Sequence, residues 1–459
     1  MRLVRPNLIH CLIVCATLLP LGARLQPVYS FPKDDTVLRK NYFDQTTKKK
    51  ELALASIGKQ YAKAYKEIYE DQFEEIGGLW QSTRPVTGAE AHSYLQSVVQ
   101  KIIAANPELK GTDARIVFTR DWWPNAVSMG DGSIAINAGL FVFMSNEAEL
   151  AFVICHELSH YYLEHTPKKI KKYIETVNSD DYQAELKRIA KTTYGAGKQL
   201  EEFARTAAFG SHRHSREFEA AADKQGYLFL KNTGYDIGAI RTTLEMLDRI
   251  DDTSLFKPLI LDKVLNTAEY PFKKKWIQKE SAIFAQVEDN SSLTEKEKDS
   301  LKTHPDCTKR IALLADQINA GSGGKTFQVN EKLFNQLKKD LFLEITEECY
   351  REKNLGRNLY YNLLLLQAGE YKEFAVYSIA RCLNELYDKQ KEHKLGTAVG
   401  TESKGNAEDY NLLLRMLGKV RLDEIAALNA AFCNAHAAEM KETAGFEKEW
   451  IRAKKLKEQ

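Results

Sequence analysis

"AFVICHELSHYYLEH", residues 151–165, places two histidines four positions apart inside an apolar run, with a glutamate directly after the first. Residues four apart lie on the same face of an α-helix, about one turn from each other. His156 and His160 can therefore point together at one metal ion, with Glu157 beside them. The alternative is a core helix that happens to carry polar residues. A third metal ligand is needed to decide between the two interpretations.

That third ligand is offered by "EFEAAAD", residues 217–223, where Glu219 and Asp223 are again four apart. A second helix would thus present two carboxylates on one face. Glu219 can complete a metal site, and Asp223 can accept the outer N–H of a ligand histidine and so fix its orientation. The alanines between them, residues 220–222, allow this helix to approach the first closely. The alternative for this pair is a solvated acidic stripe.

Zinc suits such a site because it accepts imidazole nitrogen without demanding a particular geometry. A catalytic zinc takes three protein ligands and leaves one position for water. The metal lowers the pKa of that water toward about 7, and an adjacent carboxylate can take its proton during attack on a carbonyl. The pattern therefore predicts one Zn²⁺ per chain, with His156, His160 and Glu219 near it and Glu157 as general base.

Four segments together resemble zinc metallopeptidase family 48, the HExxH…ExxAD gluzincins that include the CAAX prenyl endopeptidases and bacterial heat-shock membrane proteases. They are "NAVSMGDGSIAINAGLF", "SNEAELAFVICHELSH", "SREFEAAADKQG" and "THPDCTKRIALL", and the resemblance covers roughly residues 88 to 315. It implies His156, His160 and Glu219 as zinc ligands. It also implies Glu157 as general base and Asp223 as the hydrogen-bond partner that orients a ligand histidine.

The chain lacks the internal membrane spans of the integral members, so it resembles the soluble, exported branch of the family. Members of that branch often append helical repeats and act in envelope protein quality control. The resemblance therefore implies an endopeptidase for unfolded or misassembled envelope polypeptides. Two alternatives stay open: an exported chaperone or assembly factor with a plugged or vestigial zinc site, and an aminopeptidase, which would need a pocket for a free amine.

Arg216 and His304 are weaker site candidates. Arg216 either stabilises an oxyanion or pairs with a carboxylate as a structural residue. His304 either gates the site, by filling the open metal position from a loop, or starts a helix before Pro305. Cys155 precedes a ligand histidine, but its apolar neighbours indicate a small core residue rather than a fourth ligand.

A hairpin is predicted directly before the first motif, with Gly130, Asp131 and Gly132 as its turn. A sheet edge beside a zinc site can bind a peptide as an added strand. Gly132, Ser133, Ile134 and Ala135 are the candidates for that edge, and the alternative is an ordinary interior strand. With a strand at residues 114–120 and helices around it, the fold class is α+β, mostly helical. We expect a zincin-like domain with a small antiparallel sheet.

The N-terminal 30 residues fit a cleavable secretory signal. Arg2 and Arg5 precede an apolar stretch, and small residues at Ala23 and Ser30 offer cleavage positions. We therefore expect an exported protein, periplasmic or else extracellular, with no transmembrane span after cleavage because no later apolar run reaches about 20 residues. Five cysteines would remain, and one or two disulfides among them stay open. The net charge of +2 argues against a nucleic-acid partner.

The expected organisation is a signal peptide (1–30), a metallopeptidase domain (31–319) and a glycine-rich linker, "AGSGGK" (320–325). An all-α domain follows (326–459). Within it, "NLYYNLLLLQAGEYKEFAVYSIARCL" resembles one tetratricopeptide-type hairpin, although such arrays generally need about three repeats. The domain is therefore either a set of such hairpins or a helical domain packed on the catalytic one. In both cases it is a candidate surface for a protein partner.

Overall fold

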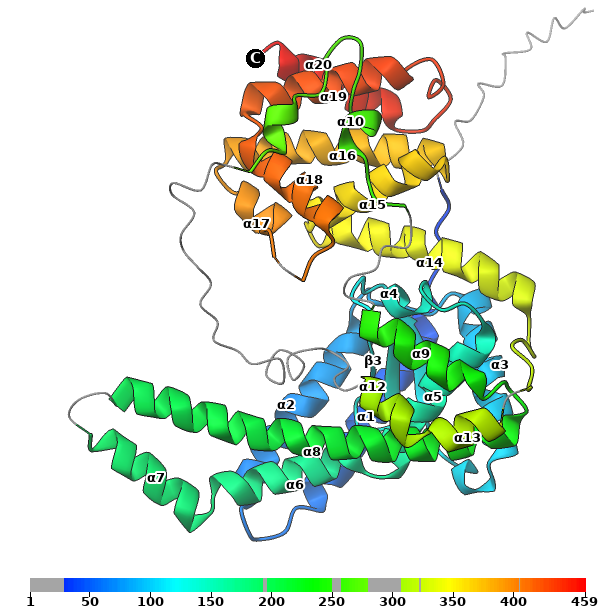
Figure 1. Ribbon diagram of the computed structural model, residues 1–459, viewed down its shortest axis with the longest axis vertical. Coiled ribbons are helices and arrows are strands. Elements are labelled where there is room, and N and C mark those ends of the chain that lie inside the picture. The colour runs from blue at the N-terminus through cyan, green and yellow to red at the C-terminus, as the bar shows by residue number, and fades with distance from the viewer. Residues whose placement is uncertain (1–28, 193–195, 250–256, 280–306, 322, 404) are drawn as a thin grey trace, which may run out of the picture.

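A computed structural model describes residues 29–192, 196–249, 257–279, 307–321, 323–403 and 405–459. It contains two bodies joined by α14 (Glu331–Arg351), as Figure 1 shows. The sheet region comprises β1–β4, α1–α9, α12 and α13, and the helical region comprises α10, η3 and α15–α20. The fold is α+β and mostly helical, as predicted. Among the described residues, no helix is both long and apolar enough to span a membrane.

The sheet has four strands in the order β1-β2-β4-β3. They are β1 (Pro85–Val86), β2 (Arg115–Thr119), β3 (Ala126–Ser128) and β4 (Ser133–Asn137). The predicted hairpin is confirmed, because β3 pairs antiparallel with β4. At its turn Gly132 has a φ of +90°, and a Cβ there would lie 2.3 Å from the Asp113 carbonyl oxygen. That position therefore needs glycine.

The prediction of an antiparallel sheet holds for two pairings and is wrong for the third. β4 pairs parallel with β2, along the register from Arg115–Ser133 to Thr119–Asn137. This pairing inserts β4 between β2 and β3, so β4 is an interior strand whose residues Ser133 to Ile136 are buried. The prediction that Gly132, Ser133, Ile134 and Ala135 form a sheet edge is therefore wrong. The edge strand on this side of the sheet is β3, the other strand of the same hairpin, and β1 is the edge on the opposite side.

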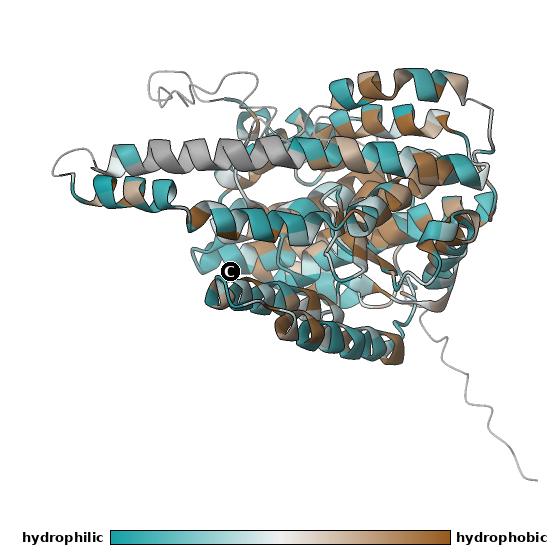
Figure 2. Cartoon of the chain, turned by 90° about the horizontal axis from the view of Figure 1, so that it is seen from below, coloured by the Kyte–Doolittle hydropathy of each residue, from teal (hydrophilic) through white to brown (hydrophobic). Residues whose placement is uncertain are grey.

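Helices cover the sheet and carry the predicted motifs. In the sheet region they are α1 (Thr36–Ala55), α2 (Ala62–Gln81), α3 (Ala89–Ala105), η1 (Pro107–Leu109), α4 (Ala138–Phe141), α5 (Glu147–Tyr162), α6 (His165–Val177), α7 (Asp180–Ala190), α8 (Ala196–Thr233), α9 (Gly238–Arg249), α12 (Cys307–Leu313) and α13 (Ala315–Ala320). α6, α7 and the first half of α8 form an arm that projects from this region (Figure 1). In Figure 2 the hydrophobic residues gather where the helices pack together, and α7 is mainly hydrophilic.

The helical region is built from α10 (Leu261–Val264), η3 (Lys274–Trp276), α15 (Leu355–Ala368), α16 (Lys372–Lys391), α17 (Leu395–Val399), α18 (Glu408–Lys419), α19 (Leu422–His436) and α20 (Phe446–Lys457). α15 and α16 pack as the predicted helical hairpin, with Gly369 in the left-handed conformation between them. Residues 257–279 also pack here, since Leu261, Leu265 and Trp276 join its core, although they precede α14 by many residues. Whether these helices are true repeats stays a prediction.

Residues near two predicted boundaries, the end of the signal peptide and the end of the linker, contact other parts of the molecule. Tyr29 contacts Phe374 edge-on, at 6.3 Å between ring centroids, and donates a hydrogen bond to Asp340. Lys325, at the end of the predicted linker, bridges to Tyr235 in the sheet region. The domain boundaries stay predictions. The five cysteines in the described part of the chain, Cys155, Cys307, Cys349, Cys382 and Cys433, are buried and free, so no disulfide links them.

Candidate active site

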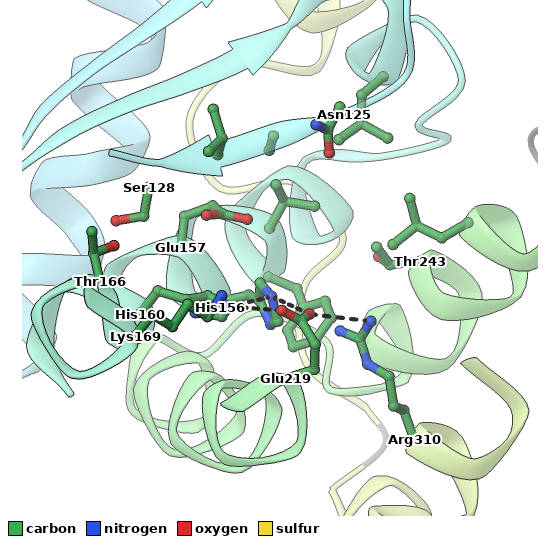
Figure 3. Close-up of a pocket in the computed structure, with 16 residues that line it drawn as sticks. Asn125, Ser128, His156, Glu157, His160, Thr166, Lys169, Glu219, Thr243 and Arg310 are labelled. Carbon is green, nitrogen blue, oxygen red and sulfur yellow. Dashed lines mark hydrogen bonds and ion pairs between the residues drawn. The ribbon is translucent and has the colours of Figure 1, made fainter. Parts of the chain in front are cut away.

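The two sequence motifs meet where α8 crosses α5. Close approach is possible because Gly226 faces the backbone of His156, where an added Cβ would lie 3.2 Å from the His156 nitrogen. α5 begins at the N-cap Asn146, whose side chain accepts the Glu149 N–H at 3.1 Å. The packing of these two helices brings His156, His160 and Glu219 together (Figure 3).

The three candidate ligands present their atoms to one point. The Nε2 atoms of His156 and His160 are 3.1 Å apart. The two carboxylate oxygens of Glu219 lie 3.3 Å from Nε2 of His156 and 3.4 Å from Nε2 of His160. Ligand atoms bound tetrahedrally to zinc at about 2.0–2.1 Å lie about 3.3 Å from one another. The donor set and its spacing therefore fit a zinc ion held by these three residues.

Each ligand histidine has an outer partner. Asp223 Oδ1 lies 2.9 Å from Nδ1 of His156, the contact predicted from the second motif. Nδ1 of His165 lies 2.9 Å from Nδ1 of His160, a partner that was not predicted. If His160 donates its Nδ1–H to His165, its Nε2 lone pair faces Glu219. Such outer hydrogen bonds orient metal-binding imidazoles and set their tautomer.

Arg310 is the main residue that the sequence analysis missed. Its guanidinium donates to both carboxylate oxygens of Asp223, at 2.6 and 2.7 Å. Its Nη1 lies 3.5 Å from the Glu219 carboxylate and lines the pocket. Arg310 is 5% exposed, so it is a buried charge between the buried carboxylate of Asp223 and the partly exposed carboxylate of Glu219. The signal was present, because Arg310 belongs to the quoted segment "THPDCTKRIALL", but no role was assigned to it.

Burial and neighbouring charges shift the pKa values of these groups in opposite directions. Burial opposes charge on His156, but contacts with Asp223 and Glu219 outweigh it and raise the His156 pKa to about 10. Burial, together with His156, lowers the pKa of His160 to about 3. Burial and two nearby lysines lower the pKa of His165 to about 4. His160 and His165 are therefore neutral near pH 7, as ligation and its support require.

Glu157 lies between the ligand cluster and the edge strand (Figure 3). It is 7% exposed, and burial raises the pKa of its carboxyl to about 7, although the charge on His156 opposes the rise. A hydrogen bond with the backbone of Ser128 also favours its charged form. A carboxyl group with a pKa near the working pH can both take and give a proton.

The pocket in front of Glu157 has a volume of about 150 Å³. β3 forms one wall through Asn125, Ala126, Val127 and Ser128. In an antiparallel ladder, alternate residues bond to the partner strand. Asn125 and Met129 bond to β4, through Asn137 and Ser133 respectively. By this alternation the backbone groups of Ala126 and Ser128 turn away from β4, toward the pocket.

The other sequence candidates have different positions. Arg216 lies on α8 one turn before Glu219, and it is not among the described residues that line the pocket. Cys155 is fully buried in the core, and burial raises its thiol pKa, which confirms the prediction of a core residue. His304 lies outside the described residues, so its gating role stays a prediction.

Glu147, the first residue of α5, anchors the catalytic helix. Its carboxylate accepts hydrogen bonds from Tyr94 at 2.9 Å and Tyr235 at 2.5 Å. It also accepts the backbone N–H groups of the three residues just before α14, 328–330. One buried carboxylate thus links α3, α5 and the chain entering α14. This network fixes the position of the helix that carries His156 and His160.

Two comparisons relate this sequence to known proteins. Residues 89–318, half of the chain, match the family model described as Peptidase family M48. The mitochondrial metalloendopeptidase OMA1 of Arabidopsis thaliana is 27% identical over 157 residues. The aligned part covers 34% of this chain and 30% of that protein, so the match spans under a third of the relative's length.

Proposed function

Because this chain belongs to peptidase family M48, we propose that it is a zinc-dependent endopeptidase acting at the cluster of His156, His160 and Glu219. The observation that carries the proposal is the spacing of the ligand atoms, 3.1 to 3.4 Å, beside a buried carboxylate on the same helix. Zinc, when bound, supplies a Lewis acid that polarises a carbonyl and activates water near neutral pH.

Glu157 performs the proton transfers of hydrolysis. As the attacking water adds to the peptide carbonyl, the Glu157 carboxylate accepts its proton, and then delivers a proton to the departing amine. The backbone of Ser128 holds the carboxylate in place. Arg310 holds Asp223 and Glu219, and so fixes the orientation of His156 and of the third ligand. Its Nη1 also places a positive charge at the pocket wall, where negative charge develops on the carbonyl oxygen.

The substrate binds in extended form along β3. The backbone of Ala126 faces the pocket and can pair with a peptide as an added strand. Val127, at the centre of this edge, is 42% exposed. Main-chain pairing requires an extended segment, and folded proteins offer few of these. This favours unfolded or misassembled polypeptides as substrates.

The place of action is an exported compartment, the periplasm or the extracellular space. The N-terminal signal supports this, and the packing of Tyr29 against Phe374 favours cleavage after Ala23 over cleavage after Ser30, which would remove Tyr29. Within that compartment, the proposed role is quality control of envelope proteins, with the helical region as the surface for a protein partner.

The test is degradation of a permanently unfolded protein such as reduced, alkylated casein by the purified chain, with Glu157→Gln in parallel. The proposal expects cutting by the wild type and at least about a thousandfold less by Glu157→Gln, with equal zinc content. Zinc binding by both proteins with cutting by neither would overturn it. Cutting by both at the same rate would exclude Glu157 from the chemistry.

A further inference from the structure

The two ends of the pocket differ in chemistry. At the end next to α9, the wall is formed mainly by apolar side chains from α4, α5 and α9, namely Leu140, Phe152, Val153 and Leu247. Thr243 and Arg310 also lie on this side, and the charge of Arg310 is paired with Asp223 and Glu219. At the opposite end, next to α6, the wall is formed by Thr166 and Lys169. Figure 3 shows Lys169 and Thr166 on one side of the ligand cluster and Thr243 of α9 on the other. An extended peptide lying along β3 would meet both ends.

Lys169 supplies the charge at the α6 end. Its side chain is exposed, and its Nζ lies 5.7 Å from the centre of the Phe218 ring. It lines the pocket on the same side of the ligand cluster as Thr166 (Figure 3). Lys169 makes none of the ion pairs seen between described residues, whereas Lys171 on the same helix pairs with Glu175. The positive charge at this end of the pocket is therefore not neutralised within the helix.

The pocket is small enough to limit the apolar end to a single large side chain. As a whole it measures about 150 Å³, close to the volume of a cavity that holds one benzene molecule. Leu140 and Phe152 at its wall are 1% and 2% exposed, so they are already covered by neighbouring protein and offer only the surface that faces the pocket. Removing a phenylalanine side chain from water at such a wall strengthens binding about tenfold or more.

We propose that this pocket selects peptides with an acidic residue on one side of the scissile bond and a single large apolar residue on the other. The inference rests on the proposed function for the location of the scissile bond. The direction of β3 also fixes the order of these two residues along the substrate. β3 runs from the α9 end, at Ala126, to the α6 end, at Ser128. Antiparallel pairing is the more stable per residue, so the substrate runs the opposite way. The acidic residue then lies on the amino side and the apolar residue on the carboxyl side.

Binding to the full-length, zinc-loaded Glu157→Gln protein tests the order without any cleavage. Two fluorescent peptides of identical composition carry a central phenylalanine, flanked by glutamate on the amino side and lysine on the carboxyl side, or the reverse. The inference expects the first peptide to bind about three to ten times more tightly, and the ratio to fall in high salt. Equal binding of the two peptides, or tighter binding of the second, would overturn it.

Two charge-reversal variants test whether Lys169 causes the difference in binding between the two peptides. Lys169→Glu, added to the Glu157→Gln protein, should abolish or reverse the ratio. Lys168→Glu is the matched control, because Lys168 is the preceding residue of α6, is exposed and donates to the Leu163 carbonyl outside the pocket. It makes the same change in net charge and should leave the ratio unaltered. A ratio that survives Lys169→Glu, or that Lys168→Glu reduces equally, would contradict the assignment.

The apolar end has its own test. Replacing the peptide phenylalanine by serine should weaken binding at least about tenfold. Leu247→Phe, which fills the apolar end, should shift the preference from phenylalanine to alanine while the circular dichroism spectrum stays unchanged. An unchanged preference would overturn the apolar half of the inference. If the binding preferences hold but the wild type cuts neither peptide, the pocket assignment stands and the proposed peptidase function fails.

Discussion

The two regions of this molecule differ in how their buried polar groups are arranged. In the sheet region, His156, Glu157, Glu219, Asp223 and Arg310 crowd together in the crossing of α5 and α8. The helical region buries the amides of Asn358, Asn362, Asn384 and Asn429, and its buried carboxylates, Asp409, Glu424 and Glu449, accept hydrogen bonds at separate places. Burying a charge costs far more than burying an amide, unless the charge is paired. The comparison supports placing the active site in the sheet region, where the charged side chains are concentrated.

The amides of the helical region act as cross-links. The Asn429 side chain donates to the Ala380 carbonyl at 3.0 Å and to Asn384 Oδ1 at 2.8 Å. The Asn384 side chain in turn donates to the backbone and side-chain oxygens of Glu449. This chain of bonds ties α16, α19 and α20 together. It needs no external ligand, whereas the charged cluster of the sheet region has three donors that face a common point.

Removal of the metal should give the largest difference between the regions. A chelator is expected to reduce peptide hydrolysis at least about a thousandfold. It should also increase hydrogen exchange in α5 and α8, because a bound ion stabilises the native state that holds it. Exchange in α16 and α19 should not change. Restoring activity and protection with zinc is the control, and uniform loosening of both regions would contradict the comparison.

Arg310→Met should give the next largest effect. It leaves the buried carboxylate of Asp223 and the partly exposed carboxylate of Glu219 without their cation. Breaking a buried pair such as Arg310–Asp223 costs about 3–5 kcal/mol of unfolding free energy. Urea denaturation followed by fluorescence would measure the loss. Arg188→Met is a matched control, since Arg188 pairs with Glu185 at the surface of α7 and should leave the free energy nearly unchanged. Equal effects of the two substitutions would count against a central role for Arg310.

Asn429→Leu tests the helical region by the same measurement, urea denaturation followed by fluorescence. It leaves the Ala380 carbonyl and Asn384 Oδ1 without their donor, which costs about 1–3 kcal/mol. Zinc content and the peptide hydrolysis rate at a temperature where the protein is folded should match the wild type. A loss of zinc in this variant would show that the two regions are coupled and not independent.

His165→Ala should weaken zinc binding and hardly change the free energy of unfolding. Removal of the outer partner of His160 is expected to weaken zinc binding about tenfold, measured by competition with a chromogenic chelator. His165→Asn places an amide oxygen near the position of Nδ1, so it should recover most of the affinity. If the alanine and asparagine variants bind zinc equally well, the 2.9 Å contact has no part in holding the ligand.

The smallest expected effect is the contribution of Glu147, which anchors α5, to the pH dependence of the unfolding free energy. Burial would raise the pKa of Glu147, but hydrogen bonds from Tyr235 and the backbone of residues 328–330 outweigh it and lower the pKa. A lowered native pKa stabilises the fold above the unfolded value of about 4.3, and this stabilisation is lost as pH falls through the native pKa. Glu147→Gln should therefore show a shallower loss of unfolding free energy between pH 5 and 3 than the wild type.

The local patterns predicted the ligand helices, because spacing within a helix fixes which side chains share a face. They did not identify β3 as the edge, because the parallel pairing of β2 with β4 joins strands that are not adjacent in sequence. Arg310 and His165 were missed for a similar reason. Each acts through a contact between separate helices, Arg310 with α8 and His165 with α5, and no spacing along one helix indicates either contact.

The most direct test of the central claim is a crystal of the zinc-loaded protein measured on both sides of the zinc absorption edge. The account predicts one anomalous peak per chain, about 2.0–2.2 Å from Nε2 of His156, Nε2 of His160 and a carboxylate oxygen of Glu219. A peak at other side chains, or no peak at this cluster in protein that contains stoichiometric zinc, would contradict it.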